Sequence, residues 1–226
     1  MIIAIAAALA ALVGAAGPLV LARLPEPPEP DDDKLAYVTL AGVPYLSLWF
    51  AGAAAAMAGL AAWKVPTELV PVWVLFAGVG TWLAYVDWRT RLLPFLLVAP
   101  MYVATLALVA LGAFLLDDWS VLAKGLIGNV AVFAVFWLIY QLGQLFDGGA
   151  FGYGDVRLSG VVGLALGALG AAETLTGTYG GFVLGAVGGL AFSRLGWVDS
   201  KGFAFGPYLV VGAIIGAAWG ASLWPM

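Results

Sequence analysis

The stretch LVPVWVLFAGVGTWLAYV (69–86) decides the fold class, because none of its 18 residues carries a charge. About 20 apolar residues cross the hydrocarbon core of a bilayer as a helix. Asp87 follows at once, within DWRTRLLP (87–94), so charge returns where the apolar run ends. The pattern predicts a transmembrane helix whose boundary is marked by a carboxylate.

The rest of the chain has the same apolar character. Of its 226 residues, 64% are hydrophobic and 10% are charged, and the mean hydropathy is +1.05. These values exclude a soluble domain and predict an all-α integral membrane protein. The net charge of −4 leaves no basic patch for binding phosphates, so we expect no nucleic-acid partner.

Dividing the chain at its charges and at its Pro and Gly clusters predicts about eight transmembrane helices. They form a single polytopic membrane domain over residues 1–226, with a short Pro-rich acidic cytoplasmic linker at 23–34. The predicted spans are 2–21, 35–62, 69–86, 94–116, 121–145, 156–172, 179–192 and 203–223.

Basic residues are distributed unequally between alternate loops. One side has Arg23, Lys34, Arg89, Arg91, Arg157, Arg194 and Lys201, and the other has Lys64 and Lys124. Cytoplasmic loops carry the excess of Lys and Arg, so the first side is predicted to be cytoplasmic and both termini extracytoplasmic. Asp87 and Asp155 both fall on the cytoplasmic side.

The chain contains neither cysteine nor histidine. This composition excludes Ser/His and Cys/His nucleophile pairs, HExxH zinc sites and disulfides. We expect no metal and no cofactor. Carboxylates are the main groups left for proton chemistry.

Asp155 is the second acid at a membrane boundary, because it follows the glycine-rich turn DGGAFGYGD (147–155) and precedes an apolar run. Two carboxylates at one depth can hydrolyse a peptide, if one is ionised to activate water and the other is protonated to polarise the carbonyl. Gly152 and Gly154 lack a Cβ and allow an extended peptide to approach closely. Tyr153 can add packing or a hydroxyl donor. The sequence therefore predicts a catalytic aspartate pair.

Three other interpretations of the two acids stay open at this point. They could be interfacial residues paired with Arg89, Arg91 or Arg157, ion ligands of a polytopic transporter or channel, or relics in an assembly scaffold. A transporter predicts acids near the middle of the membrane, whereas these acids lie at predicted helix ends. We therefore rank the transporter below the peptidase.

Four segments resemble those of a known family. The segment Gly152, Tyr153, Gly154, Asp155, with Arg157 following, resembles the GxGD motif of the type IV prepilin peptidases, which are intramembrane aspartic proteases. DWRTRLLP (87–94) resembles the first aspartate motif of the family, FGPY (205–208) its FGP segment, and RLP (23–25) the tripeptide after its first helix. The resemblance covers nearly the whole chain.

The resemblance implies an aspartic endopeptidase with Asp87 and Asp155 as the catalytic pair. Its substrates would be prepilins or pseudopilins with a basic leader and a hydrophobic helix, in type IV pilus assembly or protein secretion. Cleavage would occur at the cytoplasmic face of the inner (plasma) membrane. Many members carry a cytoplasmic loop with two CxxC pairs that is associated with N-methylation. The linker at 23–34 has no cysteine, so we do not predict N-methylation.

Overall fold

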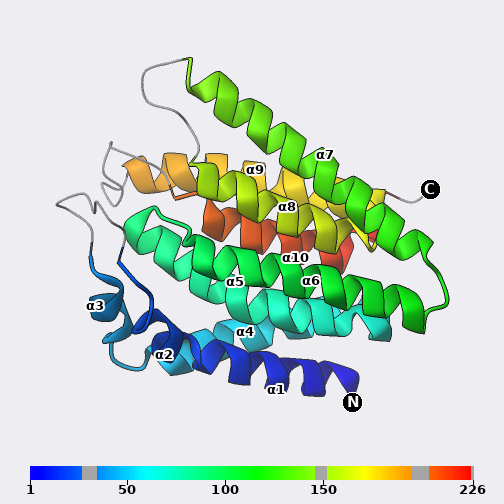
Figure 1. Cartoon of the computed structure of the whole chain (residues 1–226), viewed down its shortest axis with the longest axis horizontal. Helices are drawn as coiled ribbons and strands as arrows, with labels where there is room; N and C mark the ends of the chain where they lie inside the picture. The colour runs from blue at the N-terminus through cyan, green and yellow to red at the C-terminus, as the bar shows by residue number, and fades with distance from the viewer. Residues whose placement is uncertain (27–34, 146–151, 195–203, 225–226) are drawn as a thin grey trace.

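The computed structural model describes residues 1–26, 35–145, 152–194 and 204–224, which contain helices and no strand (Figure 1). The predicted linker from residue 27 onward, Lys34, Lys201 and residues 147–151 lie outside the described residues. The elements are α1 (Ile2–Ala15), α2 (Gly17–Leu21), α3 (Tyr37–Ala41), α4 (Leu46–Ala62), the 3-10 helix η1 (Thr67–Leu69), α5 (Val70–Thr90), α6 (Phe95–Leu115), α7 (Ser120–Gly143), α8 (Tyr153–Gly167), α9 (Ala171–Arg194) and α10 (Gly206–Leu223).

Five helical segments of the described chain are long and apolar enough to cross a membrane. They are Ile2–Leu21, Thr67–Thr90, Phe95–Leu115, Ser120–Gly143 and Gly206–Leu223. The other three predicted spans correspond to α4, α8 and α9, which are also helices but are not among the five. The protein is therefore a multi-pass membrane protein whose described elements are all helices, and the count of eight spans stays a prediction.

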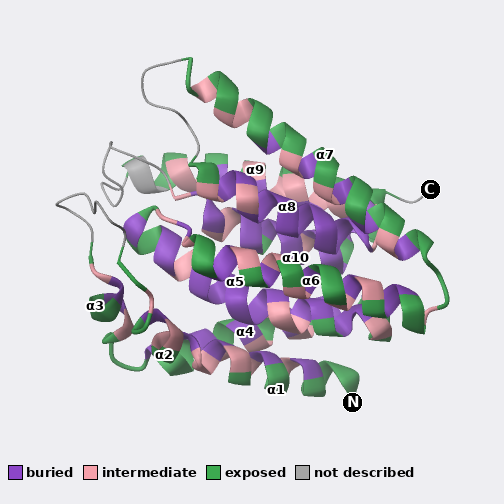
Figure 2. Ribbon diagram, in the orientation of Figure 1, coloured by how far each residue is buried: buried purple, intermediate pink, exposed green. Residues whose placement is uncertain are grey.

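Consecutive long helices run back and forth along one bundle (Figure 1). The most extensive helix pairs are α1 with α4, α7 with α8, and α9 with α10. Buried residues concentrate in α5, α8 and α10 at the centre of the bundle, whereas α1 and α7 present exposed residues on its outside (Figure 2). The central helices are therefore the ones that other helices enclose.

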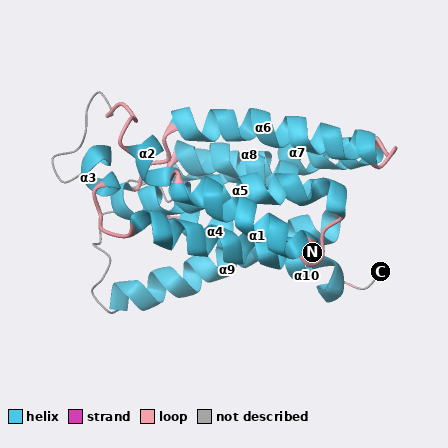
Figure 3. Cartoon of the chain, turned by 90° about the horizontal axis from the view of Figure 1, so that it is seen from below, coloured by secondary structure: helices cyan, strands magenta, loops and turns pink. Residues whose placement is uncertain are grey.

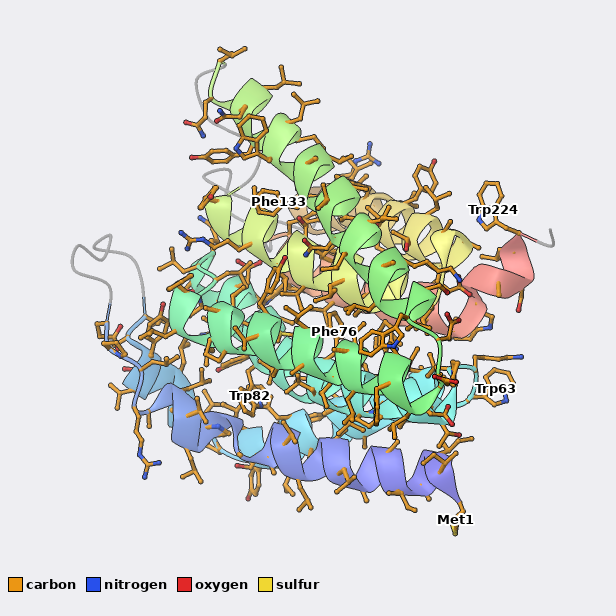
Figure 4. All side chains as sticks on the ribbon, turned by 45° about the vertical axis from the view of Figure 1, so that its right-hand side comes forward. Met1, Trp63, Phe76, Trp82, Phe133 and Trp224 are labelled. Carbon is orange, nitrogen blue, oxygen red and sulfur yellow. The ribbon has the colours of Figure 1, made fainter. Side chains whose placement is uncertain are left out.

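The two ends of the bundle differ. Met1, Trp63 and Trp224 lie at one end (Figure 4). Trp63 and Trp224 are both about half exposed, and the Lys64 Nζ lies 4.5 Å from the centre of the Trp63 ring. Trp and Lys side chains of this kind are typical of a membrane–water boundary. The opposite end carries α2 and α3 beside the start of α6 (Figure 3).

The predicted span 35–62 is not one continuous helix, so this boundary was wrong. α3 ends at Ala41 and α4 begins at Leu46. Pro44 lacks a backbone N–H and disfavours helical backbone at the preceding residue. Tyr45 then adopts a left-handed conformation with φ of +60°, which turns the chain into α4.

The boundary predicted between spans 156–172 and 179–192 was also wrong. α8 ends at Gly167 and α9 already begins at Ala171. Gly170 lies between them with φ of +155°, a conformation that a residue without Cβ adopts at little cost. The turn is therefore set by this glycine, and α9 is longer than the apolar run alone suggested.

Candidate active site

Asp87 lies in the last turn of α5 and its exposed fraction is 3%. The helix ends because Arg91 adopts a left-handed conformation with φ of +57°, and its N–H donates to the Asp87 carbonyl oxygen at 2.7 Å. Pro94 is the N-cap of α6. Only residues 91–94 connect the two helices, so the short connection fixes Asp87 at this end of the bundle.

The side chain of Asp87 is held by a distant part of the chain. Gly206, the first residue of α10, donates its N–H to Asp87 Oδ2 at 2.8 Å. Hydrogen bonds to a carboxylate are shorter and stronger than those between neutral groups. The start of α10 thus determines where this oxygen lies.

Asp155 lies in the first turn of α8 and its exposed fraction is 6%. Its Oδ2 accepts the Gly152 N–H at 3.2 Å, and its own N–H donates to the Gly152 carbonyl oxygen at 3.0 Å. This reciprocal pair caps the start of the helix. In the described part of the chain, the buried Oδ1 has no hydrogen-bond partner. An unpaired buried acceptor costs free energy, so this oxygen is ready to receive a hydrogen bond from water or substrate.

The structure brings Asp87 and Asp155 together. Their carboxyl groups lie close enough to interact electrostatically. The segments that carry the two residues also touch, because a Cβ on Gly154 would lie 2.8 Å from the Cβ of Leu93. Two neighbouring carboxylates withdrawn from water resist simultaneous ionisation, so such a pair tends to share one proton.

The ion pairs that the interfacial interpretation of the two acids requires are not formed among the described residues. Neither aspartate forms an ion pair with an arginine of the described residues, and Arg89 and Arg91 are exposed. The Arg157 guanidinium lies over the rings of Tyr153 and Phe95, 4.6 and 4.9 Å from their centres. The arginine that follows the GYGD turn is therefore held by aromatic rings.

Within the GYGD turn, the residues before Asp155 are more exposed than Asp155 itself. Gly152 is exposed, and Tyr153 is 41% exposed with its ring 5.5 Å from that of Tyr140 on α7. Gly154 provides the space in which Leu93 packs. The turn thus joins an accessible surface to a buried carboxylate.

Gly206 is a site residue that the sequence prediction missed. The FGPY segment (205–208) indicates that this region belongs to the family pattern, but it does not identify what the glycine contacts. Gly206 and Asp87 are 119 positions apart. Their hydrogen bond results from helix packing, which no local pattern predicts.

The fold and the site define a class: a multi-pass helical membrane protein with two buried, interacting carboxylates at one end of its bundle. Residues 74–221 match the sequence profile of the type IV leader peptidase family, and the chain belongs to this family.

Curated relatives include the prepilin leader peptidase/N-methyltransferase of Aeromonas hydrophila, which is 33% identical over 173 residues, or 75% of this chain and 55% of the relative. The protein of the same name from Aeromonas salmonicida (strain A449) is 31% identical over 165 residues, or 71% of this chain and 52% of the relative. The chain spans about half the length of these relatives. No solved structure matches it.

Proposed function

We propose that this chain is an intramembrane aspartic endopeptidase that removes the leader peptide of type IV prepilins or pseudopilins at the cytoplasmic membrane face. Its substrates have a basic leader followed by a hydrophobic helix. The observation that carries the proposal is that Asp87 and Asp155 are both buried and lie at one end of the bundle, on segments that touch through Leu93 and Gly154. The membership of the chain in a leader peptidase family supports the same reaction class.

In the proposed reaction, the two aspartates hold one proton between them. The ionised carboxylate takes a proton from a water molecule while the water oxygen attacks the carbonyl carbon of the scissile bond. The protonated carboxyl donates a hydrogen bond to the carbonyl oxygen of the same bond. The proton gained by the first carboxylate passes to the amine as the C–N bond breaks. The unpartnered Asp155 Oδ1 is the oxygen with free capacity for these contacts.

The residues of the GYGD turn support the pair in this proposal. Gly152 and Gly154 let an extended peptide lie close to the backbone, and Tyr153 contributes an exposed ring beside it. The Arg157 guanidinium lies over that ring. The peptide therefore approaches Asp155 over the start of α8.

We further propose a single domain over residues 1–226, with eight spans, both termini extracytoplasmic, in the inner membrane. The alternation of α1 and α4 to α10 along the bundle supports this topology (Figure 1). Reporter fusions that are active on only one side of the membrane test it. The terminal fusions should report the outside, and a fusion after Arg91 should report the cytoplasm.

The proposal comprises peptidase activity alone. The curated relatives are named for both prepilin leader peptidase and N-methyltransferase activity. This chain contains no cysteine, so its linker at 23–34 has no CxxC pair. Mass spectrometry of a processed pilin should show the new N-terminus without an added methyl group.

Coexpression with a prepilin tests the aspartate pair. Asp87→Asn and Asp155→Asn should each lower the rate of leader removal by about 10²- to 10⁴-fold, because each removes a proton-transfer group. Asp117→Asn is the matched control, since Asp117 is an exposed acid in a left-handed conformation that asparagine tolerates. Processing at the wild-type rate by either variant of the pair would refute the assignment.

A further inference from the structure

The start of α10 meets Asp87 through the backbone of Gly206. The N–H of buried Gly206 donates to Asp87 Oδ2 at 2.8 Å. A Cβ added to Gly206 would lie 2.8 Å from the same oxygen and 3.2 Å from both Cβ and Cγ of Asp87. Because three atoms of the short aspartate side chain are involved, any larger residue would displace the whole carboxyl group. Both the amide and the absence of a side chain at position 206 therefore determine where that group lies.

The two aspartates differ in what holds them. Asp155 takes its hydrogen-bond donor from Gly152, which lies at the start of the same helix. The carboxylate of Asp87 has a single hydrogen-bond donor among the described residues, and this donor comes from another helix. The orientation of Asp87 thus depends on how α10 packs, whereas the orientation of Asp155 is set locally.

The residue before Gly206 is Phe205, and its ring packs against two other phenylalanine rings. We call Phe136 of α7, Phe182 of α9 and Phe205 the phenylalanine cluster. The Phe205 ring lies 5.7 Å from that of Phe136 and 5.4 Å from that of Phe182, and the latter two rings stack at 5.0 Å. Phe205 is 3% exposed. Aromatic pairs at these distances stabilise one arrangement of their backbones. The cluster therefore ties the Gly206 amide to two further helices.

We propose that Phe205 and Gly206 are positioning residues for the catalytic pair, with the Gly206 amide and its bare Cα orienting Asp87 and the phenylalanine cluster holding that amide in place. This inference rests on the proposed peptidase function and assigns to the FGPY segment a role in catalysis without contact to the substrate. A misplacement of a catalytic group by about 1 Å can cost 10²-fold in rate. The expected defect therefore lies in kcat and leaves KM unchanged.

Gly206→Ala tests the bare Cα, and Gly80→Ala is its matched control. Gly80 also lies where α5 meets α10, and a Cβ there would be 3.2 Å from Val210 Cγ1 and away from Asp87. Purified variants are assayed for prepilin cleavage and for thermal unfolding by tryptophan fluorescence. Gly206→Ala should lower kcat by roughly 100-fold at unchanged KM. Gly80→Ala should keep the wild-type kcat.

Phe205→Leu provides a second test that keeps the glycine, in case Gly206→Ala does not fold. Its control is Phe76→Leu, because Phe76 is a fully buried ring 5.4 Å from that of Trp73 and roughly 16 Å along α5 from Asp87. Both variants should unfold at lower temperature, but only Phe205→Leu should lose kcat at unchanged KM.

The outcomes separate the two proposals. If Asp87→Asn and Asp155→Asn are inactive while Gly206→Ala has the kcat of Gly80→Ala, the positioning role is refuted and the aspartate pair stands. Equal kcat values for Phe205→Leu and Phe76→Leu refute the role of the cluster in the same way. If Asp87→Asn cleaves at the wild-type rate, the proposed function itself fails.

Discussion

α7 and α8 are neighbours in the bundle, yet their surfaces are opposite in kind. α7 is a 24-residue apolar helix that exposes large side chains such as Ile127 at 68% and Val130 at 66%. α8 has 15 residues, and every residue from Leu158 to Gly167 is buried. Only α7 is among the helices long and apolar enough to cross a membrane.

The difference shows which helices of a membrane protein a hydropathy criterion detects. A helix that faces lipid must be apolar along its length, because no water satisfies polar groups there. A helix enclosed by other helices needs only to fit its neighbours, and can be short and carry glycine, serine and aspartate. The helix that bears Asp155 is of this second kind, so a search for lipid-facing helices passes over it.

The largest effect should come from adding volume to the enclosed helix. A Cβ on Gly163 would lie 2.4 Å from the Gly128 carbonyl oxygen, where the backbones of α8 and α7 touch. Gly163→Val should therefore cost about 3 kcal/mol or more in stability. Ala131→Val adds volume to an exposed position of α7 and should cost nothing measurable. Thermal unfolding in detergent compares them, and equal melting temperatures would remove the distinction between the two helices.

A polar contact that crosses between the helices should have the next largest effect. The Asn129 side-chain amide of α7 donates to the Gly160 carbonyl oxygen of α8 at 2.7 Å and to the Tyr102 hydroxyl of α6. Asn129→Ala removes two hydrogen bonds between helices, each worth about 0.6–1 kcal/mol in a membrane, and should cost about 1–2 kcal/mol in unfolding free energy. Tyr102→Phe removes one partner only and should cost less. The prediction fails if Tyr102→Phe costs more than Asn129→Ala.

A smaller effect is expected at the partly exposed start of α8. Arg157 contacts two partly exposed rings, so replacing it with glutamine should cost about 0.5–1 kcal/mol through loss of the cation–π contacts. Arg89→Gln changes an exposed arginine that no ring of the described residues covers, and serves as the control. Matching unfolding curves for the two variants would mean that the rings contribute nothing.

The smallest effect should appear at the exposed start of α7. Hydrogen bonds from the Ser120 hydroxyl and the Ser120 N–H hold the pKa of Asp118 below its usual value. A depressed carboxyl pKa stabilises the folded state fully above the unfolded pKa of about 4, and this contribution is lost as the pH falls from there through the lower folded pKa. Asp118→Asn cannot titrate, so the stability difference from wild type should vanish at low pH. A difference that persists there would contradict this origin.

Local patterns predicted much of this molecule. The apolar run before Asp87 and the glycine turn before Asp155 predicted a helix end and a helix start, and the structure has both. The family was predicted from the GYGD and FGPY segments, and the match of residues 74–221 confirms it. The catalytic role of the pair stays a prediction.

Contacts between helices could not be predicted in this way. The Phe95 ring reaches Arg157 only when α6 packs against α8, and the Gly206 amide reaches Asp87 only when α10 packs against α5. The break at Tyr45 and the turn at Gly170 depend on single left-handed residues, which an average over an apolar run does not reveal. In the sequence, Gly42 and Pro44 were the signals for the first turn, and Gly170 was the signal for the second.

The contact between Leu93 and Gly154 has a consequence for building hybrid proteins. Leu93 belongs to the connection that follows the first aspartate, and Gly154 directly precedes the second. The two segments interlock although they are far apart in the chain, so neither can be replaced alone by the corresponding segment of a relative. A chimaera that exchanges residues 91–94 and 152–154 together should keep the geometry of the aspartates, and each half exchange should disturb it.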